Sequence, residues 1–272
     1  MTRKIITLAL VLPLWFAPTV TQAQGVGDGQ RIVVPLSDPA KPVELQVSLI
    51  AGSIDVTAYY GKEVIVIART RETRKQEQTR DGMRVIPNTS IGLTAEEKNN
   101  SVSIGADWNS RPVDLEIQVP SRTSARLSTI NSGNIAVRGL SGELELQNVN
   151  GAIRADDIRG SVVANTTNGD VLVNLVEVAR DKEMAFNSFN GDVELILPVS
   201  LRADLKISAG QGDILTNFEV EQQPVEPRIE RESSGGSHRV RMSNEIHLKI
   251  GGGGPTYRIE TFNGDVSIQK AK

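Results

Sequence analysis

The sequence predicts an all-β protein: a single-stranded, β-helix-like solenoid with coils of about 18 residues, two short strands in each coil, and further strands flanking the stack. Three observations predict this fold. Glycine recurs every nine residues, apolar and polar residues alternate after each glycine, and aromatic residues make up only 4% of the chain. With so few aromatic rings the core must be built from Val, Ile, Leu and Ala, and a thin aliphatic core suits stacked sheets.

The nine-residue spacing is unbroken over five consecutive glycines. They are Gly133, Gly142, Gly151, Gly160 and Gly169. The second and fourth residues after each glycine are apolar, and this alternation predicts a strand of four or five residues followed by a turn. An Asn-Gly pair marks every second unit, as at Asn150-Gly151 and Asn168-Gly169, so we interpret one coil as 18 residues with two strands.

Stacking the chain at this period puts apolar residues directly above one another. One column contains Ile135, Ile153, Val171 and Val193, and its neighbour contains Val137, Ala155, Val173 and Leu195. No single coil can bury its apolar face alone, which is why such coils occur in stacks. The step from Gly169 to Gly191 is 22 residues, which predicts a four-residue insertion around Asp181 to Glu183. Further copies of the unit begin at Gly52, at Gly210-Gln211-Gly212 and at Asn263-Gly264.

An antiparallel meander of hairpins is the competing topology, because Asn-Gly also favours two-residue hairpin turns. The strict nine-residue interval with alternating turn types favours the coil. Strands are also expected outside the regular repeat, at Val43–Val47, Glu63–Ile67, Val113–Pro120 and Ile246–Ile250. Exposed segments are expected near 69–84, as a charged hairpin arm or loop, and near 219–237, as a long loop rich in Glu, Gln, Pro, Ser and Gly.

Residues 1–23 differ in composition from the rest of the chain. Arg3 and Lys4 precede an apolar run from Ile5 to Phe16, and Thr21-Gln22-Ala23 places small residues where a signal peptidase reads them. We therefore expect a secretory signal peptide at 1–23, with an uncleaved anchor as the alternative, and a β-solenoid domain at 24–272. The domain is expected to be exported to the periplasm or the cell surface. No later stretch is apolar enough to predict transmembrane insertion of the mature chain.

Charge and cysteine content restrict the class of partner. The net charge of −3 argues against a nucleic-acid partner, because nucleic acid selects basic surfaces. The chain has no cysteine, so its stability must come from packing and hydrogen bonding without a disulfide framework.

The repeat units resemble those of a known family. The strand from Asp114 to Pro120, which ends in Val-Pro, and the recurring Gly-x-Ile-x-Val and Asn-Gly-Asp-Val units are similar to a bacterial family of exported β-strand-repeat proteins described only as a "putative adhesin" family of unknown function. The resemblance covers roughly residues 43 to 268, and the long 219–237 segment departs from compact members. It implies a β-helix-like domain at the cell envelope without a known activity. The family has no established functional residues to carry over.

Four acidic residues are candidates for binding calcium. Asp170, Asp192, Asp213 and Asp265 each follow a repeat glycine and are expected to align along one edge of the stack. Ca²⁺ takes six to eight oxygen ligands, which such an edge would offer. The calcium-binding nonapeptide repeat requires Gly-Gly-x-Gly-x-Asp, however, and no unit supplies it. Because Asp is also a good turn residue, a purely structural role is favoured over calcium, and no other cofactor is expected.

The sequence predicts no catalytic residue. Arg154, Asp156, Asp157 and Arg159 form the one local cluster with the side chains of a polysaccharide lyase or hydrolase. Neighbouring residues of a strand point to opposite faces, so the two aspartates are not expected to converge, and Asp157 with Arg159 is expected to form a solvated corner. Candidate binding residues are Val163 and Leu172, which should point outward, and their neighbour Arg154. The two apolar side chains lie either under a long loop or in an apolar patch for a partner.

These observations predict a non-enzymatic, exported envelope protein whose solenoid face contacts a surface glycan or protein, in the manner of an adhesin. A carbohydrate-active β-helix enzyme and a purely structural or stress-protective periplasmic protein are the alternatives. Solenoids often serve as binding scaffolds, but that support is an analogy between folds.

Overall fold

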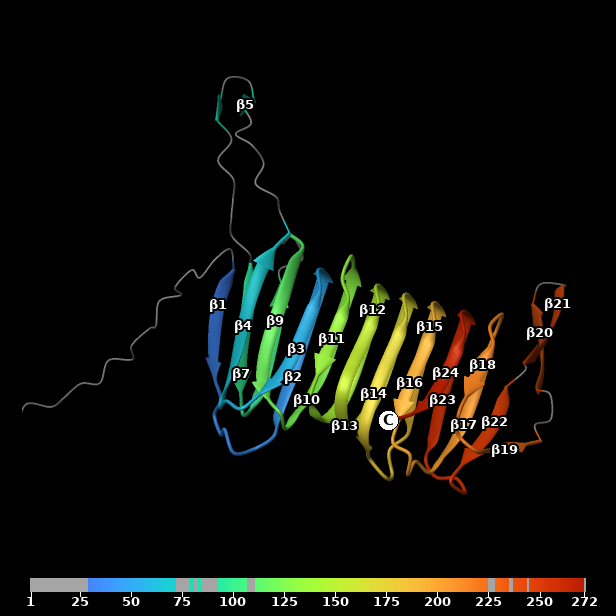
Figure 1. Cartoon of the computed structure of the whole chain (residues 1–272). Coiled ribbons are helices and arrows are strands. Elements are labelled where there is room, and N and C mark those ends of the chain that lie inside the picture. Colours follow the sequence, from blue (N-terminus) through green and yellow to red (C-terminus); the bar gives the residue numbers. More distant parts are fainter. Residues whose placement is uncertain are drawn as a thin grey trace, which may run out of the picture.

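The computed structural model describes residues 29–71, 79–80, 83–84, 92–106, 111–224, 228–234, 237–243 and 245–271. All regular structure in these residues is β-strand, so the predicted all-β class is confirmed. Twenty strands form one large mixed sheet, and the strands follow one another side by side along the molecule (Figure 1). The expected signal peptide at 1–23 lies outside the described residues. A search of the described residues found no helix with the length and hydropathy needed to cross a membrane.

The strands of the large sheet belong to two rows, which share one strand. Row I consists, in spatial order, of β7 (Leu93–Lys98), β8 (Ser101–Ala106), β2 (Val43–Ala51), β10 (Thr123–Asn131), β12 (Ser141–Asn150), the second half of β13 (Ile153–Asn168), β15 (Met184–Asn190), β23 (Thr256–Asn263), β17 (Ala203–Ala209), β22 (Ile246–Ile250) and β19 (Val220–Gln223).

Row II consists, in spatial order, of β1 (Gln30–Pro35), β4 (Glu63–Thr70), β9 (Val113–Pro120), β3 (Ile54–Tyr59), β11 (Ile135–Arg138), the first half of β13, β14 (Val171–Val178), β16 (Val193–Leu197), β24 (Val266–Lys270) and β18 (Ile214–Thr216). Strand β13 passes from row II to row I with a bend at Asp157, where φ is 54°, and at Gly160, where φ is 136°.

The 18-residue register is confirmed. Ile135 pairs with Ile153 and Ile153 with Val171, all in parallel, and the next step to Val193 spans the predicted four extra residues. The neighbouring column of Val137, Ala155, Val173 and Leu195 is confirmed in the same strands. The competing antiparallel meander is wrong for the repeat region, because consecutive units alternate between the two rows and pair with the unit two places on. The extra residues lie between Val178 and Met184, as predicted.

The order of coils along the stack differs from their order in the sequence. Strands β23 and β24 lie between the coil made by β15 and β16 and the coil made by β17 and β18. The chain reaches this place because β19 and β22 turn back antiparallel at the end of row I before residues 256–270 enter the stack. The repeat pattern predicted the strands near the C-terminus but not their insertion between two earlier coils.

Antiparallel strands cover the ends of the parallel stack. At one end β7 pairs with β8, and β4 lies between β1 and β9; at the other end β22 and β19 follow β17. The prediction of a long loop at 219–237 is therefore wrong, because β19 and a separate hairpin of β20 (Arg228–Ser234) and β21 (Ser237–Ser243) occupy it. The expected arm near 69–84 contains the end of β4 and a short pair, β5 (Thr79–Arg80) with β6 (Met83–Arg84); its remaining residues lie outside those described.

The core consists of the inward side chains of both rows, and these form one cluster. Strand patterns alternate strictly, so that Val43, Leu45, Val47 and Leu49 of β2 are buried while the residues between them are exposed. Each fully buried Val, Ile or Leu contributes on the order of 1.5–3 kcal/mol. Phe186 and Tyr257 are the largest fully buried side chains. The buried Tyr257 hydroxyl has no hydrogen-bond partner among the described residues, and burial raises the pKa of this phenol to about 12.

The corner at which row I strands end and row II strands begin carries two polar ladders. In the inner ladder a buried side chain of each coil donates a hydrogen bond to a glycine carbonyl of the neighbouring coil, at 2.8–2.9 Å; the donors are Thr129, Asn148, Thr166, Ser188 and Thr261. In the outer ladder asparagine amides join one another at 2.7–3.3 Å; its members are Asn131, Asn150, Asn168, Asn190 and Asn263. The inner ladder gives backbone carbonyls at the corner side-chain donors, and the outer ladder joins neighbouring coils through side chains alone.

We expect Gly169→Ala to lower the free energy of unfolding by about 2 kcal/mol or more. The φ of Gly169 is 147°, and a Cβ atom there would lie 2.4 Å from the carbonyl oxygen of Gly151. Gly105→Ala is the matched control, because its Cβ would meet no atom within 4 Å, and its effect should stay within about 0.5 kcal/mol. Urea unfolding followed by circular dichroism measures both. Equal effects of the two substitutions would contradict the role given to the corner glycines.

Candidate functional site

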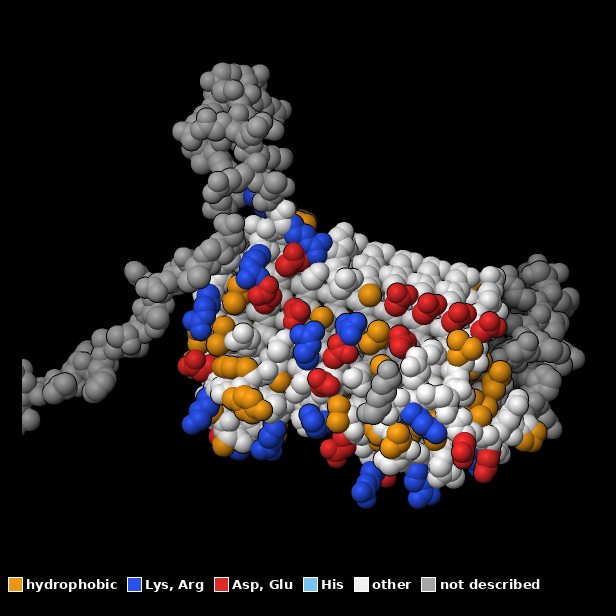
Figure 2. Space-filling view, in the orientation of Figure 1, with side chains coloured by type: hydrophobic (Ala, Val, Ile, Leu, Met, Phe, Trp, Pro, Cys, Tyr) orange, Lys and Arg blue, Asp and Glu red, His pale blue; other side chains and the backbone are white. Residues whose placement is uncertain are grey.

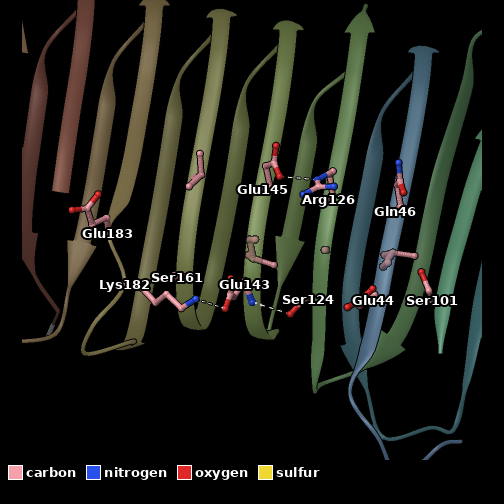
Figure 3. Close-up of a pocket in the computed structure, with 14 residues that line it drawn as sticks. Glu44, Gln46, Ser101, Ser124, Arg126, Glu143, Glu145, Ser161, Lys182 and Glu183 are labelled. Carbon is pink, nitrogen blue, oxygen red and sulfur yellow. Dashed lines mark hydrogen bonds and ion pairs between the residues drawn. The ribbon is translucent and has the colours of Figure 1, made fainter. Parts of the chain in front are cut away.

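The outward face of row I carries an open groove with a volume of about 570 Å³. It crosses strands β8, β2, β10, β12 and β13 and ends at the four-residue insertion (Figure 3). Its lining residues are Glu44, Leu45, Gln46, Ser101, Ser124, Ala125, Arg126, Glu143, Leu144, Glu145, Ser161, Val163, Lys182 and Glu183. The outward members come from alternate positions of neighbouring strands, so the 18-residue register places side chains that are distant in sequence next to one another.

Two ion pairs cross the groove, and two further carboxylates, Glu44 and Glu183, line it. Arg126 Nε lies 2.7 Å from Glu145 Oε2, between strands β10 and β12. Lys182 Nζ, from the insertion, lies 2.9 Å from Glu143 Oε1 (Figure 3). These side chains are between 36% and 66% exposed, so each ion pair contributes at most about 1 kcal/mol to stability. With four glutamates against one arginine and one lysine, the groove carries a formal charge of −2, and both of its cations are already paired.

Neutral polar groups line the floor between the ion pairs. The hydroxyl of Ser124 accepts a hydrogen bond from the backbone N–H of Glu143 at 3.1 Å, and the amide of Gln147 donates to Glu145 Oε1 at 2.9 Å. Ser161 lies in the same transverse line as Glu143, because the two residues pair across β12 and β13. Hydroxyl, amide, carboxylate and guanidinium groups in one open groove can bind a ligand that offers many donors and acceptors and no negative charge.

The predicted binding residues lie on different rows. Val163 lines the groove of row I and is partly buried between Glu145 and Ala185. Leu172 and Arg154 pair with each other on row II, and Arg154 Nε lies 2.6 Å from Asp156 Oδ2. The hydrogen bond to Asp156 raises the pKa of Arg154 further above its usual value. The three residues therefore form no single patch, because alternate nine-residue units belong to opposite rows.

The four candidate calcium residues align along one edge, as predicted. Asp170 Oδ1 accepts a hydrogen bond from the Asp192 backbone at 3.0 Å, Asp192 Oδ1 from Asp265 at 2.8 Å, and Asp265 Oδ1 from Asp213 at 2.8 Å. A row of acidic side chains is visible along the upper part of the molecule (Figure 2). Within the described residues, no three His, Cys, Asp or Glu side chains group in a way that could hold a metal ion. Calcium at this edge stays a prediction, while the observed hydrogen bonds give these aspartates a structural role in stacking.

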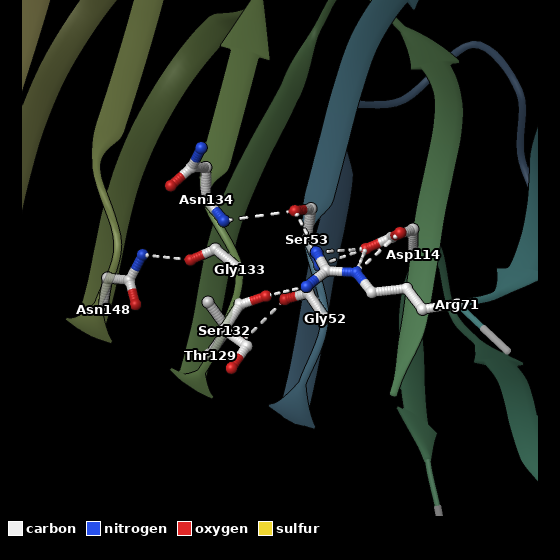
Figure 4. A network of polar contacts seen from close by, with 9 residues as sticks. All are labelled: Gly52, Ser53, Arg71, Asp114, Thr129, Ser132, Gly133, Asn134 and Asn148. Atoms are coloured by element: carbon white, nitrogen blue, oxygen red, sulfur yellow. Dashed lines mark hydrogen bonds and ion pairs between the residues drawn. The ribbon is translucent and has the colours of Figure 1, made fainter. Parts of the chain in front are cut away.

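A second polar network, which the sequence did not reveal, joins the start of the exposed arm to the stack (Figure 4). Arg71 Nε lies 2.9 and 2.8 Å from the two carboxylate oxygens of Asp114, and Arg71 Nη2 lies 2.9 Å from Ser53 Oγ. Arg71 also donates to the carbonyl of Ser132 in the next coil. Burial alone would raise the pKa of Asp114, but the hydrogen bonds from Arg71 and from Ser53 outweigh it and hold that pKa below its ordinary value.

These observations define a β-strand-repeat protein with a polar, open groove across one row of its coils. Residues 105–269, more than half of the chain, match the model of the Toastrack DUF4097 family, and the chain belongs to this family. The predicted family resemblance is thereby confirmed. A crystal structure of a "putative cell adhesion protein" from Clostridium sporogenes is similar to this chain with a TM-score of 0.42 and 12% identity, over 89% of this chain and 100% of the other. No curated protein matches the sequence.

We expect the stability supplied by Asp114 to depend on pH. Because its folded-state pKa is lowered, the contribution is present above the unfolded-state pKa of about 4 and is lost as the pH falls through the folded-state value. Asp114→Asn should therefore lower the thermal midpoint near neutral pH, and the difference from the wild type should shrink as the pH falls below about 4. Thermal unfolding at a series of pH values measures this. A difference that stays constant down to the acid limit would contradict the assignment.

Proposed function

We propose that this protein is a non-enzymatic, exported component of the cell envelope that uses a β-solenoid scaffold to bind a neutral, hydroxyl-rich envelope glycan in the groove of row I. The parallel register of 18 residues, repeated in both rows, supports the solenoid interpretation. The composition of residues 1–23 supports export. A scaffold of stacked coils presents outward side chains in straight transverse lines, which suits an extended polymer.

The observation that carries the proposal is that both cations of the groove are already paired with carboxylates. Arg126 pairs with Glu145 and Lys182 with Glu143, so no cation is free to bind an anionic ligand, and Glu44 and Glu183 add negative charge that repels one. Both pairs are exposed and weak, so a ligand with many hydroxyl groups can exchange hydrogen bonds with them at low cost. A protein partner on the same face would need an apolar centre, and the outward apolar contribution of Val163 is partly buried.

Co-sedimentation of the purified protein with isolated sacculi and envelope fractions tests binding, in the presence of calcium and in the presence of a chelator. Saturable pelleting that soluble glycan fragments compete away is the expected result. Calcium dependence would bring the row of Asp170, Asp192, Asp265 and Asp213 forward as part of the site. A folded protein that stays in the supernatant under every condition would contradict the binding function and favour a structural or stress-protective role.

We expect Arg126→Glu to weaken pelleting by about tenfold or more, because it removes an ion pair and places two carboxylates side by side in the groove. Arg154→Glu is the matched control on row II, where the arginine is similarly exposed and similarly paired with a carboxylate, Asp156. The fraction bound at a series of sacculus concentrations measures both variants. A larger effect of Arg154→Glu would contradict the groove of row I as the binding site and would indicate that the ligand binds on row II.

The proposed absence of enzymatic activity is tested by a separate measurement. Incubation of the bound protein with sacculi should release no soluble reducing ends or unsaturated sugars above a protein-free control. Release that the wild type supports and Arg126→Glu abolishes would overturn this part of the proposal in favour of a carbohydrate-active enzyme.

A further inference from the structure

A ridge of exposed apolar side chains follows the corner between the two rows. Equivalent positions in seven neighbouring coils are occupied by Ile50, Ile130, Val149, Thr167, Phe189, Phe262 and Gly210, in that order along the stack. The five large apolar members are 39% to 52% exposed. They are almost half of the large hydrophobic side chains that are exposed among the described residues, and they lie in one line.

The chemistry of the ridge restricts what can cover it. No charged residue occurs between any ridge residue and the glycine that ends its turn, in any of the seven coils. The rings of Phe189 and Phe262 stack on each other with centroids 5.1 Å apart, and the backbone at Gly210 packs against Phe262. Each ring therefore has one face covered by the other ring, which leaves less ring surface on which a sugar could stack.

A second row of residues, the flank, runs beside the ridge, three positions after the ridge residue in most coils. Charge is distributed unevenly along this row. In stack order it contains Ser53, Asn134, Ala152, Asp170, Asp192, Asp265 and Asp213, so the acidic residues occupy only one half. At the opposite end the guanidinium of Arg71 contacts Ser53 and Ser132. The acidic half is unfavourable for an anionic lipid surface.

We propose that this ridge is the surface on which two copies of the chain associate, as an antiparallel two-fold dimer. An uncharged apolar strip can face itself without repulsion, which an isologous interface requires. In the antiparallel arrangement the acidic half of one flank lies against the partner's uncharged half, where the guanidinium of Arg71 is already paired with Asp114. At the centre of the row, Asp170 of one copy faces Asp170 of the other, and this is the one place where two aspartates of the row meet. A parallel arrangement would place the four carboxylates against the row I side chains of Asn165, Asn187, Glu260 and Ser208, which offer no cation and add a further carboxylate.

The seven coils are spaced by about 4.8 Å, so the ridge is about 29 Å long. It forms the apolar centre of the contact, and the asparagine ladder and the flanks form its polar rim. The dimer does not use the groove of row I, so association and glycan binding can succeed or fail independently.

Sedimentation velocity of the purified protein over a dilution series tests the association. A reversible dimer is expected for the wild type, and Val149→Asp should weaken it at least about tenfold, because each dimer contains the substitution twice. Val176→Asp is the matched control: Val176 is 44% exposed against 39% for Val149, but it lies on β14 away from the ridge. Circular dichroism and thermal midpoints of the two variants establish that both fold. Equal weakening by both, or a monomeric wild type, would overturn the proposal, and flotation of that monomer with phosphatidylcholine vesicles would assign the ridge to a lipid surface instead.

The orientation has an independent test, since the chain has no cysteine of its own. Thr167 occupies the fourth of the seven ridge positions, so the two-fold axis passes beside it. Thr167→Cys should therefore form a disulfide-linked dimer under mild oxidation, while Ile50→Cys at the end of the ridge should not. Cross-linking of both variants would replace the antiparallel arrangement with a parallel one, and cross-linking of neither would contradict the ridge as the contact.

Discussion

Close contact between glycine backbones at one corner of every coil is the constraint on which the rest of the structure depends. The N–H of Gly151 donates to the carbonyl of Asn168 at 2.8 Å, and Gly169 makes the same bond to Asn190. A side chain at these positions would meet the glycine of the neighbouring coil well inside van der Waals contact. Because the corner fixes the register of both strands that meet there, every inward side chain falls into a column above a residue of similar shape.

The same register organises the outward positions, where the core imposes no requirement on chemistry. Row I carries a polar groove whose ion pairs join neighbouring coils, and the corner carries an uncharged apolar ridge. The edge of row II carries aligned aspartates whose carboxylates bind the backbone of the next coil. One repeat thus carries three different surfaces. Successive residues of a strand point alternately toward the core and away from it, and only the inward residues must be apolar.

Insertion of residues 256–270 between two earlier coils makes the far end of the stack depend on contacts across long stretches of sequence. Asn190 bonds to Asn263, and Phe189 stacks on Phe262, although more than seventy residues separate the members of each pair. Strands β17 and β18 find their final partners only when the last residues of the chain are in place. Such non-local pairing slows folding but ties the C-terminal region firmly to the core.

The sequence by itself determined the strands, the 18-residue period, the inward columns such as that of Ile153, and the alignment of the acidic edge. These features depend on local alternation and on fixed spacing, which are read directly from the residues. Only the tertiary structure decided that Lys182 reaches Glu143, that Arg71 binds Asp114, and that residues 256–270 enter between two other coils. The physical reason is that coils with similar aliphatic columns fit on one another almost interchangeably, so their order depends on where the whole chain returns and not on any local pattern.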